Sequence, residues 1–130
     1  MAPESTLKRI SRVLLAIFFV VAGVNHFLRP GPYLAMMPPW LPWPVAMNQI
    51  SGAAEIAGGL GILFPWKRRC AAWGLIALLV AVFPANLQVA LHGWPGMHIP
   101  AWILWARLPF QPLLIAWVYL TCLRRDATQG

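Results

Sequence analysis

The chain has 130 residues, of which 60% are hydrophobic and only 10% are charged, and its mean hydropathy is +0.67. About a quarter of the residues in a water-soluble domain are charged, so the composition excludes an ordinary soluble protein and indicates an integral membrane protein. The net charge of +7 does not indicate a nucleic-acid partner, because the basic residues form short clusters at the ends of apolar runs.

Four apolar runs of membrane-spanning length follow one another along the chain. A span needs about 20 residues, since a helix rises about 1.5 Å per residue and the hydrocarbon core is about 30 Å thick. The runs predict an all-α, single-domain, four-helix membrane bundle with helices at about residues 13–28, 45–64, 70–91 and 101–123. The second run is rich in glycine, which lets helices approach closely in lipid, so we expect it to be the central helix.

The basic residues are distributed unevenly over the connections between these runs. They precede the first run, join the second to the third and follow the last, as Lys8, Arg9 and Arg12, then Lys67, Arg68 and Arg69, then Arg124 and Arg125. With four crossings these clusters fall on one side, and the positive-inside rule makes that side the cytoplasm, with both termini there. The alternative is a cleaved signal peptide ending near Ala22, which we disfavour because the apolar run continues past that position.

The connection between the first two runs, Pro30–Pro44, is dense in proline and aromatic residues and nearly uncharged. Proline opposes regular helix, while Tyr33, Trp40 and Trp43 are residue types that prefer the headgroup region. We therefore expect an irregular segment that lies on the outer interface or covers the helix ends as a lid.

Polar residues within the predicted spans all fall in the outward half of each helix. Counted at about 1.5 Å per residue, Glu55 and Arg107 both lie roughly 10 Å below the outer boundary, and the polar residues of the other helices lie within about one turn of that level. The candidate pocket residues are Asn25 and His26 in the first helix, Glu55 in the second, Asn86 in the third, and Arg107 and Gln111 in the fourth.

Glu55 and Arg107 are the only acidic and the only basic residue within the predicted spans. An isolated charge at that depth costs at least about 2.5–3.5 kcal/mol on insertion scales, so neither should face lipid. We expect a buried ion pair between them. The polar layer then either lines a ligand pocket, reached from the outer face beneath Pro30–Pro44, or only fixes the register of the helices.

The sequence contains no catalytic or metal-binding pattern. P-loop, GxSxG and HExxH motifs are absent, so we predict no catalytic residues. Cys70 and Cys122 form no CxxC, and no Cys/His cluster has metal-ligand spacing, so we predict no metal site. We also expect no haem, because nothing in the sequence fixes His26 and His92 face to face.

Several segments, taken as a set, resemble the DoxX family of small bacterial membrane proteins over nearly the whole chain. They are Gly23–Phe27, Met36–Pro39, Ile50–Leu63, Arg69–Ile76, Val82–Asn86 and Arg107–Pro112. The resemblance implies a multi-pass, four-helix protein of the bacterial inner membrane, with a quinone as its natural ligand. It also implies that Glu55, Asn86, Arg107 and Gln111 form a shared polar centre, and it leaves the reaction open.

Three functional hypotheses follow. The first is an accessory membrane subunit, not an enzyme on its own, whose outer-half pocket holds a quinone or another small lipophilic ligand in a redox or stress-linked complex. The second is the membrane subunit of a quinone-linked oxidoreductase, in which His26 or Glu55 moves protons. The third, a small multidrug-type transporter, is disfavoured because the biased basic residues oppose dual insertion. The expected partners are the bilayer and either a membrane redox protein or further copies of the chain.

Overall fold

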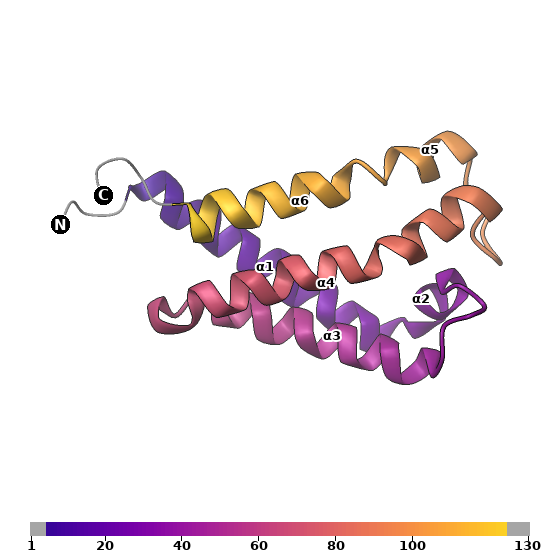
Figure 1. The fold of residues 1–130 in the computed structure, drawn as a ribbon, viewed down its shortest axis with the longest axis horizontal. Coiled ribbons are helices and arrows are strands. Elements are labelled where there is room, and N and C mark those ends of the chain that lie inside the picture. The colour runs from indigo at the N-terminus through magenta and orange to yellow at the C-terminus, as the bar shows by residue number, and fades with distance from the viewer. Residues whose placement is uncertain (1–4, 125–130) are drawn as a thin grey trace.

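The computed structural model describes residues 5–124, and all regular elements in that part of the chain are helices. They form an elongated bundle of roughly antiparallel helices (Figure 1). In chain order the elements are α1 (Thr6–Leu28), α2 (Pro30–Met36), α3 (Pro44–Gly61), α4 (Pro65–His92), α5 (Ala101–Ala106), α6 (Phe110–Val118) and a π-helical segment, η1 (Tyr119–Leu123). The predicted all-α class is confirmed.

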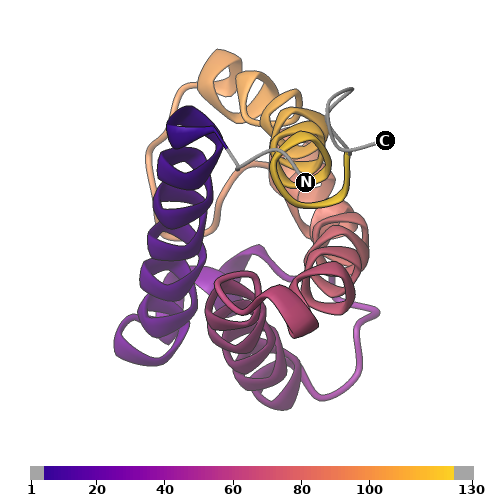
Figure 2. The ribbon, with the colours of Figure 1, turned by 90° about the vertical axis from the view of Figure 1, so that its left-hand side faces the viewer.

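Three helical stretches are long and apolar enough to cross a membrane, namely α1, α4 and Ala101–Leu123, which runs from α5 to η1. The remaining long helix, α3, has 18 residues and is rich in glycine and polar side chains. It packs against α1, α2 and α4, but α4 contacts more elements, so α3 is not the central helix that the sequence predicted. Seen along the bundle, the long segments stand around a common axis in the order α1, α3, α4 and α6 (Figure 2).

Three of the predicted helices differ from the structure. The third begins at Pro65 rather than near residue 70, because proline suits the first position of a helix. The first helix begins at Thr6 rather than near residue 13, because the Ser5 hydroxyl accepts a hydrogen bond from the Lys8 backbone N–H at 3.2 Å and caps the helix. The fourth helix is not continuous but is interrupted between α5 and α6. Pro109 and Pro112 have no N–H to donate to the helix, so the backbone departs from α-helical geometry there.

The segment Pro30–Pro44, which we expected to be irregular, begins with the short helix α2. Pro30 is the first residue of this helix, a position where the backbone N–H has no intrahelical partner and where the fixed φ of proline suits the helix. The irregular backbone is confined to the stretch between α2 and α3. There, Trp43 has a positive φ of 49°, directly before Pro44 begins α3.

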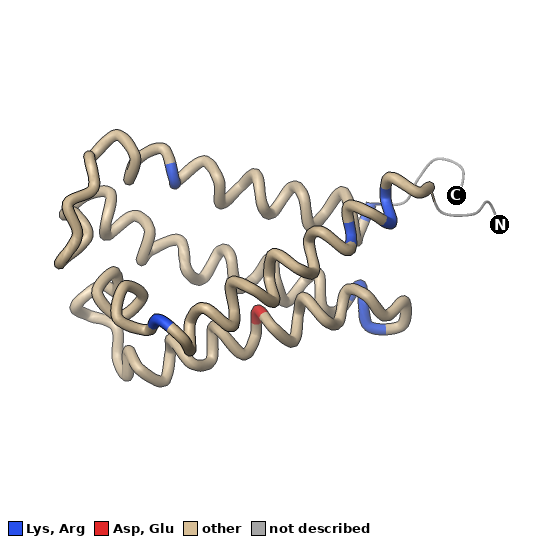
Figure 3. The backbone as a smooth tube through the Cα atoms, turned by 180° about the vertical axis from the view of Figure 1, so that it is seen from behind, with Lys and Arg blue, Asp and Glu red and all other residues tan. Residues whose placement is uncertain are grey.

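One end of the bundle, hereafter the basic end, brings together the start of α1, the α3–α4 turn and the end of η1. Lys8 Nζ donates to the backbone oxygen of Arg124 at 2.9 Å, and the hydroxyls of Ser11 and Thr121 lie 2.9 Å apart. Most Lys and Arg residues of the described chain lie at this end (Figure 3), whereas Arg29 directly precedes α2 and Arg107 directly follows α5. The predicted one-sided clustering is therefore confirmed, apart from Arg125, which lies outside the described residues. The opposite end carries α2 and is called the α2 end.

A hydrophobic core fills the half of the bundle near the basic end. Its fully buried members come from α1, α4 and α6 and from the residue after α3, and include Leu15, Phe19, Ile62, Leu75 and Val118. Many apolar side chains on the outside of the helices are exposed, as expected of helices that face lipid rather than water. This packed half supports the other half, in which the polar residues lie.

Glycine allows α1 and α3 to touch backbone to backbone where the polar residues begin. A Cβ atom added at Gly52 would lie 2.8 Å from the Cβ of His26, and one added at Gly23 would lie 2.6 Å from the backbone oxygen of Gly52. Real Cβ contacts are not that short, so a larger residue at either position would force the two helices apart.

We predict that Gly52→Ala destabilises the protein, because the added methyl group displaces α3 from α1. The expected loss is about 1–3 kcal/mol of unfolding free energy, the usual range for overpacking. The measurement is reversible unfolding in mixed detergent micelles. Gly74→Ala is the matched control, since nothing lies within 4 Å of its added Cβ; it should be neutral or stabilising by up to about 1 kcal/mol through helix propensity. Equal effects of the two substitutions would contradict the close contact.

Candidate functional site

A cavity of about 170 Å³ lies in the half of the bundle toward the α2 end, and we call it the polar cavity. Side chains of α1, α2, α3, α4 and the α5–α6 junction line it. Its apolar wall includes Phe18, Ala22, Leu79 and Leu114. Its polar lining consists of His26, Tyr33, Glu55, Asn86, Arg107 and Gln111.

His26 and Asn48 join α1 to α3 through two hydrogen bonds. Asn48 Nδ2 donates to the backbone oxygen of His26 at 2.9 Å, which orients the amide so that its Oδ1 faces His26 Nδ1 at 2.7 Å. Nδ1 must therefore carry the proton and donate, because an amide oxygen only accepts. Both residues are buried, so these bonds fix the ring of His26 in position and in tautomer.

The other ring nitrogen of His26 faces Glu55. Nε2 lies 3.3 Å from Glu55 Oε2, and the two side chains are only 11% and 13% exposed. Since Nδ1 already holds a proton, an unprotonated Nε2 would direct its lone pair at a carboxylate, which is repulsive. The contact is favourable when one further proton resides on the pair, on Nε2 or on the carboxyl group. The wall of the polar cavity thus places an imidazole nitrogen beside a carboxyl group.

Helix α2 covers one end of the polar cavity. The ring of Tyr33 stacks on that of His26 with centroids 3.8 Å apart and an interplanar angle of 23°. The Tyr33 hydroxyl accepts a hydrogen bond from Asn25 Nδ2 at 2.6 Å, and Met36 and Met37 also line the cavity. The segment that the sequence assigned either to the interface or to a lid therefore supplies part of the cavity wall.

The loop after α4 holds this cover in place. Trp94 Nε1 donates to the backbone oxygen of Pro32 at 2.9 Å, which ties the loop to α2. The Cζ atom of Arg107 lies 4.6 Å from the centroid of the Trp94 ring, a cation–π geometry. Arg107 therefore keeps an electrostatic partner on one side while it lines the cavity on the other.

Three buried polar atoms around the polar cavity have no partner within the described residues. They are Asn86 Oδ1, Arg107 Nη1 and Gln111 Oε1; Glu55 Oε2 also makes no hydrogen bond but has the 3.3 Å contact with His26 Nε2. A buried polar atom without a partner costs about 1–3 kcal/mol, and such atoms are uncommon in native proteins. The three side chains come from α4, the α5–α6 junction and α6 and line the same cavity. Two of the atoms are acceptors and one is a donor, so an occupant that both donates and accepts would satisfy them.

The expected ion pair between Glu55 and Arg107 is not formed. Glu55 lies against His26 and Arg107 against Trp94. The reason is helix adjacency: α3 packs along α1, so Glu55 meets the side chain that α1 presents, whereas Arg107 follows α5 on another wall of the cavity. The polar side chains line a cavity, and three of their atoms have no partner among the described residues.

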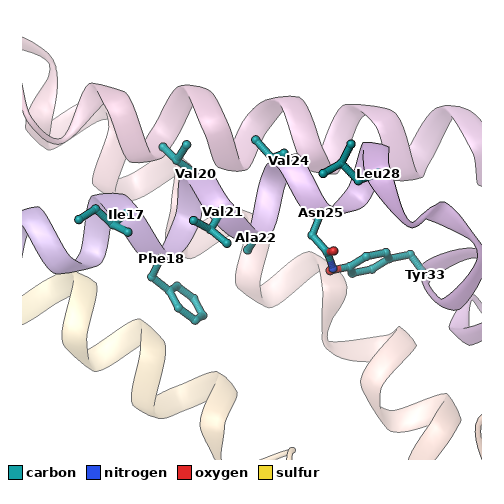
Figure 4. Close-up of a pocket in the computed structure, with 9 residues that line it drawn as sticks. All are labelled: Ile17, Phe18, Val20, Val21, Ala22, Val24, Asn25, Leu28 and Tyr33. Atoms are coloured by element: carbon teal, nitrogen blue, oxygen red, sulfur yellow. The ribbon is translucent and has the colours of Figure 1, made fainter.

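Asn25 is the one candidate residue that does not line the polar cavity. A helix turns by about 100° per residue, so Asn25 and His26 face different directions. Asn25 lies in a groove along α1 with its amide directed at Tyr33 (Figure 4). Sequence reasoning missed Asn48 as a site residue, although its spacing of seven residues from Glu55 places both on one face of α3.

The described residues hold no group of three or more His, Cys, Asp and Glu side chains that could bind a metal ion. Both cysteines are free thiols, with Cys70 exposed and Cys122 partly buried. The polar groups that line the cavity offer hydrogen bonding and charge to a bound molecule.

Comparison with known proteins places the chain in a family. A family model described as "Domain of unknown function (DUF8561)" matches residues 15–122, and the chain belongs to this family. The matched region includes every residue that lines the polar cavity. No curated protein and no solved structure matches the chain significantly.

We predict that Glu55 is energetically coupled to His26 more strongly than to Arg107. Double-mutant cycles with Glu55→Gln, His26→Gln and Arg107→Gln, read as unfolding free energies in detergent, measure both couplings. The 3.3 Å contact should give a coupling of about 1–3 kcal/mol for Glu55 with His26, and a clearly smaller value with Arg107. A larger coupling of Glu55 with Arg107 than with His26 would contradict this prediction and support the direct ion pair expected from the sequence.

Proposed function

We propose that this chain is a multi-pass, DoxX-type membrane protein whose polar cavity binds a small lipophilic ligand, with a quinone as the best candidate. It would act as an accessory subunit of a redox or stress-linked membrane complex. The observation that carries the proposal is the set of three buried, unpartnered polar atoms around one cavity, from Asn86, Arg107 and Gln111. Bound ligand would satisfy atoms that the protein itself leaves without hydrogen bonds.

The size and chemistry of the polar cavity support a quinone. A cavity of about 150 Å³ accommodates a benzene ring in another protein, and the polar cavity is of similar size at about 170 Å³. A quinone carbonyl accepts from the Arg107 guanidinium or from the amide N–H groups of Asn86 and Gln111. The reduced form, a quinol, also donates two O–H groups, which suits the unpartnered oxygens of the same amides. Leu79, Leu114 and Phe18 supply the apolar surface that a ring requires.

The proposed membrane arrangement has four spans, with α3 as the fourth beside the three longer stretches. Helix α3 packs lengthwise between α1 and α4, so a membrane that contains its neighbours also contains α3. The basic end would face the cytoplasm of a bacterial inner membrane and the α2 end the opposite side, by the positive-inside rule. Both termini would then lie in the cytoplasm and the polar cavity in the outer half of the bilayer.

A second candidate function, the membrane subunit of a quinone-linked oxidoreductase, is favoured by the His26–Glu55 pair. The reduction of a quinone to a quinol requires two electrons and two protons, and this pair holds an exchangeable proton at the cavity wall. The electrons would come from a partner redox protein. The two candidates differ in one measurement, since proton uptake coupled to quinone reduction requires Glu55 only in the second.

We predict that a cysteine at residue 35 is labelled by an impermeant thiol reagent in intact cells, whereas a cysteine at residue 128 is not. Ala35 lies in α2, at the end opposite the basic clusters, and Thr128 lies outside the described residues, five residues after Leu123. The background lacks Cys70 and Cys122, and permeabilised cells show that both sites can react. Labelling at residue 128 but not at residue 35 would overturn the orientation.

We predict that Gln111→Leu weakens ligand binding about tenfold or more, with a smaller loss of stability than Arg107→Leu. The substitution Gln111→Leu removes one hydrogen bond to the ligand and leaves no unpaired charge. The substitution Arg107→Leu also removes the contact of Arg107 with Trp94. Extraction of purified protein, with mass spectrometry of the extract, identifies and quantifies the bound molecule. Gln88→Leu is the matched control, because Gln88 is half-buried on α4 and does not line the polar cavity. Protein that binds no quinone and carries no small molecule would refute the proposal.

A further inference from the structure

We propose that the polar cavity takes a ligand with a polar ring and one hydrocarbon tail, that the tail lies in a groove along α1, and that the ligand arrives sideways from the bilayer between α1 and α6. This inference rests on the proposed function and deepens it. The sequence suggested a different route, from the outer face beneath Pro30–Pro44. Three hollows in the structure, which share side chains with one another, carry the argument.

The first is an apolar groove of about 660 Å³ along the outside of α1, here called the α1 groove (Figure 4). Apart from Asn25 and Tyr33, whose polar ends bond each other, its lining is aliphatic or aromatic. The lining residues are Ile17, Phe18, Val20, Val21, Ala22, Val24, Asn25, Leu28 and Tyr33. Such a surface offers nothing to a polar group and is suited to a hydrocarbon chain.

The α1 groove and the polar cavity have wall residues in common. Phe18, Ala22 and Tyr33 line both. Ala22 is a small residue between the two, and Phe18 extends from α1 toward α6 (Figure 4). A molecule whose ring occupies the polar cavity therefore has a continuous path for its tail past Phe18 and Ala22. This continuity identifies the occupant of the groove as the tail of the same ligand.

A third hollow, of about 300 Å³, shows where the polar cavity opens, and we call it the side hollow. It is lined by Asn86, Arg107 and Gln111 of the polar cavity together with Phe18, Phe110 and Leu114. These apolar residues belong to α1 and α6. Helix α1 packs along α3 and meets the last helix toward the basic end, at η1 and at Trp117, whose ring lies 6.3 Å from that of Phe18; on the other side of Phe18, α1 and α6 have few contacts. The opening is thus lateral, at the depth of the apolar helix surfaces.

The α2 end, by contrast, is closed. Tyr33 stacks on His26, and the hydrogen bond from Trp94 to Pro32 holds α2 over the cavity. A route from water would have to break these contacts, whereas the lateral route passes only the half-exposed ring of Phe18 and the exposed ring of Phe110. A lipophilic ligand is also far more concentrated in the bilayer than in water. Both facts favour access through the side hollow.

The test compares two probes, decylubiquinone and its tailless parent ubiquinone-0, in phosphatidylcholine nanodiscs. Each probe equilibrates between protein-containing and protein-free discs, so affinity is measured relative to the bilayer and simple partitioning cancels. Native protein should bind the tailed probe about tenfold or more tightly than the tailless one. Val21→Trp, which fills the α1 groove without touching the polar cavity, should abolish this preference and leave ubiquinone-0 binding unchanged. Leu14→Trp is the matched control on α1, since Leu14 is exposed and lines none of the three hollows.

The lateral route is tested by measuring the rates at which decylubiquinone associates and dissociates. Phe110 lines the side hollow but not the polar cavity, so Phe110→Trp should slow both association and dissociation of decylubiquinone by about fivefold or more, with Kd changed by less than about twofold. Leu113→Trp, at an exposed residue of α6 outside these hollows, should change neither rate. Unchanged rates in the Phe110 variant would overturn the lateral route.

The other outcomes separate this inference from the proposed function. Equal affinity for both probes, unaffected by Val21→Trp, would overturn the tail site and leave the proposed function standing. Binding of neither probe would overturn both. If native mass spectrometry shows a dimer that Val21→Trp dissociates, the α1 groove is an interface between copies. If it shows a phospholipid that Val21→Trp releases, the occupant is an acyl chain. Either of these last two results also overturns the tail site.

Discussion

The arrangement of the bundle toward the α2 end, where the polar cavity lies, depends on the two hydrogen bonds between Asn48 and His26. In an apolar bundle each of these groups would be costly to leave unpaired, so the bonds hold α1 and α3 in a single register. The register places the His26 ring where Tyr33 stacks on it and where Glu55 reaches its second nitrogen. Gly52 makes the close approach possible, because any side chain there would collide with His26.

The placement of Glu55 and Arg107 decides which polar groups the cavity offers to a ligand. A direct Glu55–Arg107 pair would have consumed the polar capacity of both residues and closed the space between them. Instead, Glu55 lies beside a histidine and Arg107 over an indole ring, and Arg107 Nη1 has no hydrogen-bond partner among the described residues. Charges held apart on opposing walls polarise a ligand between them, and this property suits a molecule with two polar ends on one ring.

The two halves of the bundle divide structural and functional roles. Near the basic end, Leu15, Phe19 and Val118 form a packed core, and hydrogen bonds tie α1 to η1. Toward the α2 end, a proline interrupts the last helix, and polar side chains line a cavity beside a second, smaller apolar cluster of Met36, Val89, Ala90 and Leu104. The first half provides the stability that a bundle needs if its second half is to keep a polar cavity.

The sequence by itself determined the helical class, the approximate spans, the gathering of basic residues at one end and the layer that contains His26, Glu55, Asn86, Arg107 and Gln111. Hydropathy and residue counting along a helix suffice for these features, because they depend on composition and on a fixed rise per residue. Which polar residues touch was decided only by the tertiary structure. Contacts depend on which helices are neighbours and on the 100° turn between successive residues, so Glu55 pairs with His26, Asn25 turns away, and Asn48 and Tyr33 join the site. The same packing left α1 and α6 apart, which sequence periodicity does not encode.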